Sequence, residues 1–456
     1  MSLVSIQPFD GKKIQEYDEM DEGQVGRILA ESSRAFAGWK KKSFAERAGP
    51  LKAAAAILVQ RQRQLAELMA REMGKPLKQA LAELEKCAKG CEFYAEKGEG
   101  FLREEPSPTD ALRSYVSFEP LGTILAVMPW NYPFWQVFRF AAPALMAGNA
   151  ALLKHASNVS GCALAIENVL SEAGFPQGLF RSLLLSSERV AAVIRHPEVK
   201  AVTLTGSNRA GEVVAAEAGR NLKKTVLELG GSDPFLILAD ADLEKAATVA
   251  AQSRLLNAGQ SCISAKRFIV VPEIREAFEA EFLQKMAEVR LGDPLSETTE
   301  MGPLARADLR ETLQKQVDAS VKQGARLLLG GKALEGPGAY YPPTVLGGVK
   351  AGMPAYEEEI FGPVAAILEA QNEEDAIRLA NDTSYGLGAT VFTRDLKRGE
   401  RIAKDRLEAG SCFVNAMVRS DPRLPFGGVK ASGYGRELSV FGIREFVNIK
   451  SIYIQE

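Results

Sequence analysis

The sequence predicts an α/β fold with parallel sheets, because apolar segments of strand length alternate with helical segments along most of the chain. The alternation occurs twice, first in residues 122–231 and again in residues 233–395. The chain has 456 residues, which is too long for one ordinary hydrophobic core. Together these observations favour two α/β domains that each contain a sheet.

The first α/β unit follows a helical N-terminal region. Residues 22–105 are rich in Ala, Leu, Glu and Lys and show helical spacing of apolar residues, so we expect helices there. From residue 114 onward, strand-like and helical segments take turns. We expect strands at 114–120, 122–129, 150–157, 201–207 and 223–231, and helices at 134–148, 161–174 and 209–219.

The second α/β unit begins at Asp233 and is followed by a separate C-terminal strand. Residues 444–456 alternate in polarity after a glycine-rich stretch, and a terminal strand with a free edge is suited to pairing with another subunit. Within the unit we expect strands at 233–242, 267–273, 324–331, 365–371 and 386–395, and helices ending near Leu256 and covering 274–290 and 373–382.

Composition and charge exclude several classes of function. Hydrophobic residues make up 46% of the chain and charged residues 25%, as in an average soluble globular protein. The formal net charge is −2, so no global positive field attracts nucleic acid. No stretch approaches the roughly 20 apolar residues of a membrane span, and the N-terminus resembles neither a secretory signal nor a transit peptide. We expect a soluble, cytoplasmic protein without nucleic-acid or membrane partners.

The five cysteines are too few for a disulfide framework in a chain of this length. Cys87 and Cys91 lie four residues apart in a predicted helix, and no second Cys pair or His cluster completes a metal site, so we expect no metal. Cys262 differs, because it follows Gly259 among small neutral residues where another molecule has room to approach. It is either a nucleophile or a buried thiol that fills space.

A thiol that attacks a carbonyl needs a base, donors for the developing oxyanion and a way to resolve the covalent intermediate. The chain has only two histidines, His155 and His196, which argues against a cysteine hydrolase or amidase. Glu228 ends a buried strand and is a candidate base, because apolar surroundings raise the pKa of a carboxylate. Asn131, on a loop between two prolines, is a candidate oxyanion donor. Their structural alternatives are a satisfied strand-end carboxylate and a helix cap.

A candidate phosphate-binding turn follows the strand at 201–207. Gly206 and Ser207 precede a helix, and a helix N-terminus of this kind can hold a phosphate. The segment is neither a standard dinucleotide fingerprint nor a P-loop, because Glu212 stands where a P-loop requires lysine. On its own the turn is a weak indication of a nucleotide.

Five segments together resemble the aldehyde dehydrogenase superfamily, and the likeness covers nearly the whole chain. They are PWNYP at 129–133, LELGG at 227–231, GQSC at 259–262, EEIFGPV at 358–364 and PFGGVKASGYGRE at 425–437, in that family's order and spacing. The resemblance implies a Rossmann-type parallel-sheet cofactor domain, an α/β catalytic domain and a small β oligomerisation element in a homodimer or homotetramer. The implied ranges are 1–110 and 123–230 for the cofactor domain, 231–425 for the catalytic domain, and 111–122 and 440–456 for the oligomerisation strands.

The resemblance also implies a mechanism, with Cys262 as the nucleophile that attacks an aldehyde. The Asn131 side chain and the Cys262 N–H would hold the oxyanion, hydride would pass to NAD(P), and Glu228 would activate the water that hydrolyses the thioester. Cofactor contacts are implied for eight residues: Trp130, Lys154, Ser157, Gly206, Ser207, Leu229, Glu359 and Phe361.

Ser157 bears on the choice of cofactor. Family members that prefer NAD often place an acidic residue at this position to bind the ribose 2′-hydroxyl. Here a small neutral serine, with Lys154 three residues earlier, leaves space and positive charge for a 2′-phosphate. We expect NADP as the preferred cofactor, with NAD as the alternative.

The closest likeness within the superfamily is to bacterial succinate-semialdehyde dehydrogenases. It implies that Arg139 binds the substrate carboxylate, with Arg139 and Trp135 on one helix face. Arg419 is a weaker option, and a surface salt bridge is the structural alternative for Arg139. Ser261 and Ser420 are further candidate hydrogen-bond donors to the substrate.

Two positions depart from the pattern of some of these relatives. Ser264 replaces a second cysteine, so no redox-switch disulfide is expected, and Leu256 replaces a second arginine. Other small aldehydes therefore stay open as substrates: glutarate semialdehyde, an aliphatic aldehyde or an amino-aldehyde. A non-catalytic protein with this fold is disfavoured, because Cys262, Glu228 and Asn131 are all present.

Overall fold

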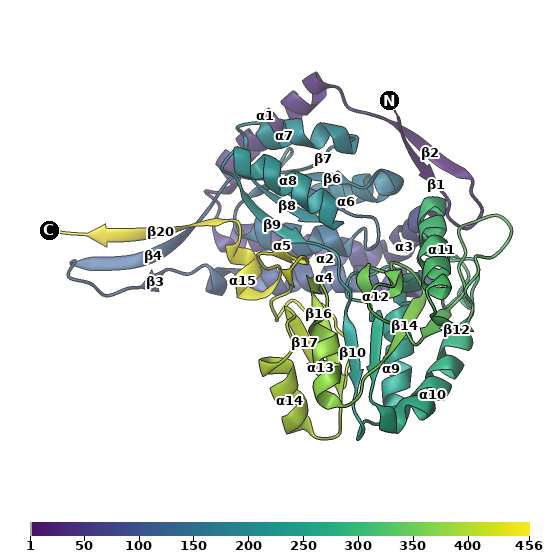
Figure 1. The fold of residues 1–456 in the computed structure, drawn as a ribbon. Coiled ribbons are helices and arrows are strands. Elements are labelled where there is room, and N and C mark those ends of the chain that lie inside the picture. Colours follow the sequence, from purple (N-terminus) through teal and green to yellow (C-terminus); the bar gives the residue numbers. More distant parts are fainter. Residues whose placement is uncertain (1) are drawn as a thin grey trace.

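The helical N-terminal region folds as four helices in the computed structural model, which describes residues 2–456 (Figure 1). Asp21 and Ser43 each form a capping box at the start of a helix, and Gly74, with φ of +79°, ends the third. The sequence predicts the helical content of this region correctly. The helices are α1 (Glu22–Trp39), α2 (Phe44–Gln60), α3 (Gln62–Met73) and α4 (Leu77–Phe101).

The first sheet has six strands in the order β19-β9-β8-β5-β6-β7, all parallel except the short β19. The chain runs outward from β5 in one direction and then returns to β8 on its other side. This reversal opens a crevice at the carboxyl ends of β5 and β8, where ligands bind in open α/β sheets. The strands are β5 (Thr123–Met128), β6 (Ala150–His155), β7 (Phe180–Ser182), β8 (Val199–Thr205), β9 (Lys224–Glu228) and β19 (Gly433–Tyr434).

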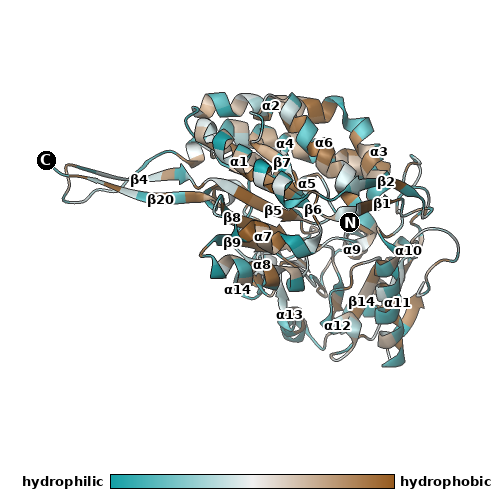
Figure 2. Ribbon diagram, turned by 90° about the horizontal axis from the view of Figure 1, so that it is seen from above, coloured by the Kyte–Doolittle hydropathy of each residue, from teal (hydrophilic) through white to brown (hydrophobic). Residues whose placement is uncertain are grey.

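Helices cover both faces of this sheet, because alternate strand residues point to opposite sides and both sides are apolar. Leu125 and Leu152 pack with α1, α7 and α8, whereas Ile124 and Leu153 pack with α2 to α6. Figure 2 shows the apolar strands between these two helical layers. The helices introduced here are α5 (Trp135–Met146), α6 (Ser160–Glu172), α7 (Val190–Arg195) and α8 (Asn208–Arg220).

The second sheet has seven strands in the order β12-β13-β14-β11-β10-β16-β17 and its own hydrophobic core. All neighbours are parallel except β12 and β13. Its strands are β10 (Pro234–Ile237), β11 (Arg267–Val270), β12 (Arg326–Leu329), β13 (Thr344–Gly347), β14 (Val364–Glu369), β16 (Gly388–Phe392) and β17 (Ser411–Val414). Its helices are α9 (Leu243–Leu255), α10 (Arg275–Ala287), α11 (Ala307–Lys322), α12 (Pro354–Glu357), α13 (Glu373–Asn381) and α14 (Leu396–Asp405).

A three-stranded antiparallel arm projects from the body of the molecule (Figures 1 and 2). It consists of β3 (Glu105–Pro106), β4 (Arg113–Pro120) and the C-terminal β20 (Val447–Ile454). The arm exposes large apolar side chains, with 63% of Ile449 and 54% of Tyr453 open to solvent. An arm of this kind is suited to burial against another protein surface.

Short elements complete the chain and join distant parts of it. The hairpin of β1 (Ser2–Ile6) and β2 (Lys13–Asp18) precedes α1, and β15 (Tyr385–Gly386) pairs with β18 (Val429–Lys430). The helix α15 (Ser439–Arg444) packs against α4 and α5. No helix among residues 2–456 is both long and apolar enough to cross a membrane.

Candidate active site

Cys262 follows a left-handed turn between α9 and β11. Asn257, Ala258 and Gly259 have φ of 55°, 53° and 72°, which is a left-handed conformation that most L-residues rarely adopt. Gly259 is required there, because a Cβ atom would lie 2.2 Å from the carbonyl oxygen of Gly362. The turn redirects the chain so that Cys262 emerges at the crevice rather than continuing the axis of α9.

Hydrogen bonds fix this turn to the loop that carries Asn131. Asn257 Nδ2 donates to the backbone oxygens of Asn131, at 2.8 Å, and Gln260, at 3.1 Å. Asn131 Nδ2 donates to the same Gln260 oxygen at 3.1 Å, and the Gln260 side chain accepts from the Ala305 N–H. The buried amide of Asn131 therefore lies beside the Cys262 loop, as a candidate oxyanion donor must.

Lys266 is a second anchor of the Cys262 loop that the sequence reasoning missed. Its ammonium group donates to the backbone oxygens of Ser261, Cys262 and Ser264 at 3.0, 2.9 and 3.2 Å. It also lies 3.7 Å from the Glu359 carboxylate. Lys266 is fully buried, so it places a positive charge under the loop and connects the loop to a predicted cofactor contact.

Cys262 lines two cavities at once. One has a volume of about 570 Å³ and the other about 380 Å³, and Gln136 also borders both. Burial raises the pKa of the Cys262 thiol to about 12, although the positive charges of Arg139 and Lys266 act in the opposite direction. The thiol is therefore protonated near neutrality in this state, and it needs a base before it can attack.

Glu228 lies at the end of β9 with both carboxyl oxygens buried and without a hydrogen-bond partner within residues 2–456. Burial raises its pKa well above the usual range, and the neighbouring Glu437 raises it further. Arg139 and Arg436 lower it. Glu228 is not among the residues that line the two cavities around Cys262, but a buried, unpaired carboxyl group of raised pKa is a candidate general base.

Arg139 is already paired with a protein carboxylate. The Arg139 guanidinium forms an ion pair with Glu437, and the two side chains are only 3% and 5% exposed. Arg139 also donates to Thr205 Oγ1 at 3.3 Å, and its charged group lies 4.8 Å from the centre of the Phe426 ring. Arg139 lines the larger cavity, but its role as the carboxylate ligand of the substrate stays a prediction.

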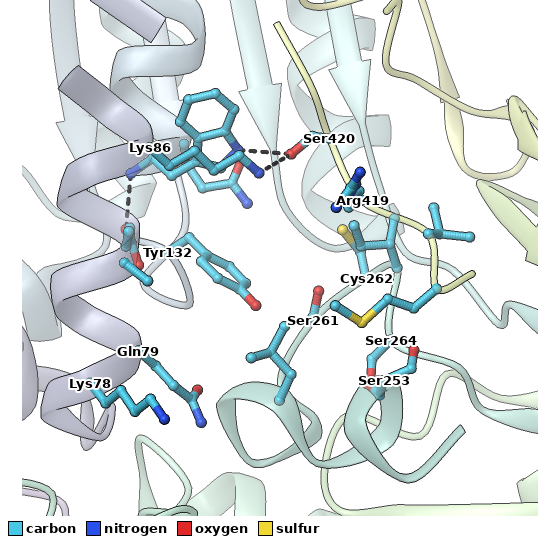
Figure 3. A pocket seen from close by; sticks show the side chains of 18 of the residues that line it. Lys78, Gln79, Lys86, Tyr132, Ser253, Ser261, Cys262, Ser264, Arg419 and Ser420 are labelled. Carbon is cyan, nitrogen blue, oxygen red and sulfur yellow. Dashed lines mark hydrogen bonds between the residues drawn. The ribbon is translucent and has the colours of Figure 1, made fainter. Parts of the chain in front are cut away.

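Trp135, Ser261 and Ser420, the other predicted substrate contacts, line the larger cavity, and their contact with substrate stays a prediction. Trp135 Nε1 donates to Ser420 Oγ at 3.0 Å, and Lys86 Nζ donates to the same oxygen at 2.7 Å (Figure 3). In this view Lys86 and Ser420 lie together at one end of the pocket, with Cys262 and Ser261 on a wall beside them. Ser264 also lines this cavity, and its hydroxyl donates to the Ser253 backbone oxygen.

A buried carboxylate fixes the helix that carries Trp135 and Arg139. Glu83 Oε1 accepts hydrogen bonds from the backbone N–H groups of Phe134 and Trp135, both at 2.9 Å. A negative charge at this position also stabilises the N-terminal dipole of α5. Lys75 forms a buried ion pair with Glu83 and lies 3.7 Å from the centre of the Tyr132 ring.

The smaller cavity gathers six of the eight predicted cofactor contacts. Trp130 and Phe361 form an edge-to-face pair with ring centres 5.8 Å apart. Glu359 accepts from the Gly231 N–H at 3.0 Å, and burial raises the pKa of its carboxyl group. Gly231 leaves no room for a side chain, because a Cβ atom would lie 2.6 Å from the Cys262 oxygen. The six lining residues are Trp130, Gly206, Ser207, Leu229, Glu359 and Phe361.

A third cavity, of about 350 Å³, shares the lining residue Ser207, the N-cap of α8, with the second. Lys154 lines it and lies 3.4 Å from Ser187 Oγ, a residue that the sequence reasoning missed. Ser157 is exposed, and it is not among the residues that line these three cavities. An aromatic pair, a helix N-terminus and a lysine along one path suit a dinucleotide with phosphate groups.

His155 is structural rather than catalytic. Its Nε2 lies 2.9 Å from the Pro133 oxygen, and its Nδ1 lies 3.0 Å from the Ala156 nitrogen, which donates to it. Burial lowers the pKa of the ring to about 4, so the histidine is neutral at physiological pH. It stabilises the 129–133 loop and is not itself among the residues that line the cavities around Cys262.

Protein stability is expected to fall in acid because of His155. The unfolded chain titrates near 6.5 and the folded protein near 4, so the unfolded state binds more protons between these values. His155 therefore contributes about 3 kcal/mol to the free energy of unfolding above about pH 6.5. This contribution is lost as the pH falls to about 4. Urea unfolding across this range checks it. In His155→Gln the fall in unfolding free energy is expected to be smaller than in the wild type, and an equal fall would contradict the assignment.

Known proteins resemble this chain over its whole length. Residues 2–452 match the aldehyde dehydrogenase family. The chain is 48% identical to a protein of Synechocystis sp. named probable succinate-semialdehyde dehydrogenase (NADP+), and 48% identical to succinate-semialdehyde dehydrogenase (NADP+) 1 of Mycobacterium bovis, each over 100% of both chains. The crystal structure of succinic semialdehyde dehydrogenase from Streptococcus pyogenes in complex with NADP+ superposes with a TM-score of 0.97, at 39% identity and with 100% of both chains covered.

Proposed function

The chain belongs to the aldehyde dehydrogenase family, and from this premise we propose that it oxidises succinate semialdehyde to succinate with NADP as the preferred cofactor. Cys262 carries the proposal, because it lies where a cavity with a polar, cationic end meets a cavity suited to a nicotinamide cofactor. Relatives of the same length and fold are named for this substrate and cofactor.

The first half of the reaction is carried by Cys262. The Cys262 thiol gives its proton to water in the open larger cavity, and its sulfur attacks the aldehyde carbon, so that a carbon–sulfur bond forms and the carbonyl electrons move to oxygen. The Asn131 amide and the Cys262 N–H donate to this oxyanion. The positive charges of Arg139 and Lys266 favour the thiolate over the neutral thiol. NADP, held by the residues that line the smaller cavity, would supply the acceptor for the hydride that leaves this carbon, and the carbon would then be a thioester of Cys262.

The second half of the reaction is carried by Glu228. Its carboxylate takes a proton from a water molecule, and the oxygen of that water attacks the thioester carbon. The carbon–sulfur bond then breaks, which releases the carboxylic acid and frees Cys262. Because the Glu228 carboxyl group has no hydrogen-bond partner in the described protein, its oxygens can accept a proton from the attacking water.

The proposed cofactor contacts are the eight residues predicted from the sequence. Seven of them line a cavity, whereas Ser157 does not. Six line the cavity beside Cys262, and Lys154 lines the third cavity. Ser157 is supported only by its sequence position and by its exposure close to Lys154 along the chain. The positive charge of Lys154 favours a 2′-phosphate, and Ser187 is a further hydroxyl beside it.

Substrate and cofactor preference are tested together by initial rates with succinate semialdehyde and propanal, each with NADP and NAD. We expect kcat/KM to favour succinate semialdehyde over propanal by about two orders of magnitude, the effect of a charge-assisted contact. We also expect kcat/KM to be higher with NADP than with NAD, because the Lys154 ammonium group can form a charge-assisted contact with the 2′-phosphate, which NAD lacks. If propanal is oxidised equally well, the chain remains an aldehyde dehydrogenase but the proposed substrate is wrong.

Other substrates within the family give distinct outcomes in the same assay. Glutarate semialdehyde also ends in a carboxylate, so its rate measures how strictly the cavity selects length. Higher rates with aliphatic or amino-aldehydes would instead favour those alternatives. A cysteine hydrolase, the alternative from another class, would act without any cofactor.

Assembly and location form a coarser part of the proposal. The arm formed by β3, β4 and β20 exposes Ile449 and Tyr453, which supports a homodimer or homotetramer with the arm at a subunit interface. All five cysteines are free thiols, which supports a reducing, cytoplasmic location. We propose the same division into cofactor, catalytic and oligomerisation regions as the sequence predicts. The first sheet, the second sheet and the arm support it.

A further inference from the structure

Lys266 lies directly before β11, the middle strand of the seven-stranded sheet. Its backbone is fixed on both sides, because its N–H donates to the Asp233 oxygen at 3.1 Å and its own oxygen accepts from the Ala366 N–H at 2.9 Å. Cys262 lines the larger cavity (Figure 3), whereas Lys266 lines none of the three cavities around the site. A fully buried side chain that starts from a rigid strand can therefore hold the Cys262 loop from within the protein.

The Cys262 loop occupies all the hydrogen-bond donors of the Lys266 ammonium group. An ammonium group has three N–H donors, and here they reach the backbone oxygens of Ser261, Cys262 and Ser264. The Cys262 oxygen has no other donor within residues 2–456. The Ser261 oxygen has one other, the Ser264 N–H at 3.2 Å. The two peptide groups that flank the Cys262 Cα thus both direct their oxygens at one ammonium group.

The direction of these oxygens determines the direction of the Cys262 N–H. In a trans peptide group the C=O and N–H bonds point in opposite directions, and no peptide bond in the described chain is cis. The Ser261 oxygen points at Lys266, so the N–H of the same peptide group, which belongs to Cys262, points away from Lys266. This N–H has no acceptor within residues 2–456, so it is available to donate to a ligand.

The same contacts determine where the thiol lies relative to the oxyanion donors. The orientations of the two peptide groups that flank a Cα set φ and ψ of that residue, and with them the direction of its Cβ. Lys266 holds both peptide groups of Cys262. Asn131 is tied to the same loop, because its Nδ2 donates to the Gln260 oxygen at 3.1 Å. The nucleophile and both proposed oxyanion donors therefore belong to one hydrogen-bonded unit.

The Lys266 ammonium group also acts on the site through its charge. Burial lowers the pKa of Lys266, whereas the Glu359 carboxylate, 3.7 Å away, raises it. Arg254 at the end of α9 lowers this pKa, and Asp233 before β10 and the Cys262 thiol raise it. The positive charge in turn favours the thiolate form of Cys262. A test of the hydrogen bonds must therefore be separated from a test of the charge.

We propose that Lys266 is a positioning residue that holds the Cys262 N–H in the direction required for donation to the oxyanion of the reacting carbonyl. The inference rests on the proposed mechanism, in which this N–H and the Asn131 amide stabilise the oxyanion, but it does not depend on which aldehyde is the substrate. Lys266 acts only through the loop, and it lies outside the five segments that carry the family resemblance.

Two reagents that modify the Cys262 thiol separate the oxyanion from the thiolate. With p-nitrophenyl acetate, the sulfur bonds to the acetyl carbon, a tetrahedral oxyanion forms and p-nitrophenolate leaves. With iodoacetamide, the sulfur displaces iodide from a saturated carbon and no oxyanion forms. The burst of p-nitrophenolate gives the acylation rate constant, and mass spectrometry of the Cys262 peptide gives the alkylation rate constant. Their ratio reports the oxyanion donors, because both reactions need the thiolate.

In Lys266→Met this ratio is expected to fall about 10- to 100-fold, because the loop oxygens lose their common donor and the N–H is no longer held in place. Lys266→Gln keeps two N–H donors on a shorter side chain, so its ratio is expected to fall less, by about 3- to 10-fold. Both variants lose the charge, so the pH profile of alkylation should move to higher pH in both.

Lys223→Met is the matched control. Lys223 is a half-buried lysine whose ammonium group also donates to two backbone oxygens, those of Ile194 and His196, and it lines none of the three cavities. The control should lower the free energy of unfolding without changing the ratio. Circular dichroism and thermal unfolding of each full-length variant verify that it is folded.

Equal losses of acylation and alkylation in the Lys266 variants would overturn the proposal, because Lys266 would then act on the thiolate alone. A ratio within about two-fold of the wild type in Lys266→Met would also overturn it, and Lys266→Gln decides in the same way if the methionine variant does not fold. Neither reagent is an aldehyde, so these results are independent of the substrate. A wild type that oxidises propanal as well as succinate semialdehyde would overturn the proposed substrate and leave the role of Lys266 in place.

Discussion

Replacing Cys262 with alanine is expected to lower kcat for aldehyde oxidation by at least about four orders of magnitude. The loss follows from the covalent step, because no other thiol lines either cavity at the site. Burial and the neighbouring charges of Arg139 and Lys266 act on this sulfur, and alanine removes the group that they act on. Cofactor binding should survive, since it depends on contacts on the other side of Cys262.

The measurement is NADPH formation in single-turnover and steady-state experiments, with cofactor binding followed by fluorescence. Cys412→Ala is the matched control, because Cys412 is a free, half-buried thiol on β17 that lines neither site cavity. The control should retain wild-type rates. More than about 1% residual kcat in Cys262→Ala would exclude a mechanism that depends on this nucleophile.

Several candidate site residues predicted from the sequence share one property. They lie at or just beyond the carboxyl ends of strands, where the topology of a parallel sheet gathers ligands. Asn131 follows β5, Ser207 follows β8 and Glu228 ends β9, so alternation of strands and helices is enough to bring them together. Local glycines, such as Gly259 and Gly231, mark the places where backbone or ligand approaches closely.

The parts that the sequence could not predict depend on contacts between residues far apart in the chain. Arg139 and Glu437 form a buried pair across almost 300 positions, and Lys86 reaches Ser420 across 334. In both pairs, the sequence around one residue gives no indication of the other. Arg139 therefore appeared free to bind substrate, whereas the structure gives it a counter-ion.

The sequence pattern also failed to predict segments whose local residues only weakly favour the observed conformation. The helix α11 is polar over most of its length, with Leu313, Val317 and Ser320 buried, so its apolar stripe is too narrow to stand out. The left-handed turn before Cys262 includes Ala258, a residue that rarely adopts this conformation alone. Tertiary hydrogen bonds from Asn257 and Gln260 hold it, and these cannot be read from the segment itself.

Replacing Glu228 with glutamine is expected to separate the two halves of the reaction. Glutamine has nearly the same shape but cannot take a proton from water, so hydrolysis of the thioester should slow by about 10²- to 10⁴-fold. Attack by Cys262 and hydride transfer should continue. Rapid mixing should therefore show a burst of about one NADPH per active site followed by a slow steady state. A variant without a burst, slow from the first turnover, would place Glu228 in the first half of the reaction instead.

The pH dependence of thioester hydrolysis is a further check on the role of Glu228 as the base. Because burial and Glu437 raise the pKa of Glu228, its active, deprotonated form grows as pH rises, and the wild-type hydrolysis rate should rise with it. The Glu228→Gln variant should lose that dependence. In Glu437→Gln one neighbouring negative charge is removed and Arg139 is left unpaired, so both changes lower the pKa of Glu228. Its hydrolysis profile should shift to lower pH, and a shift to higher pH would mean that the two carboxyl groups do not interact as their positions require.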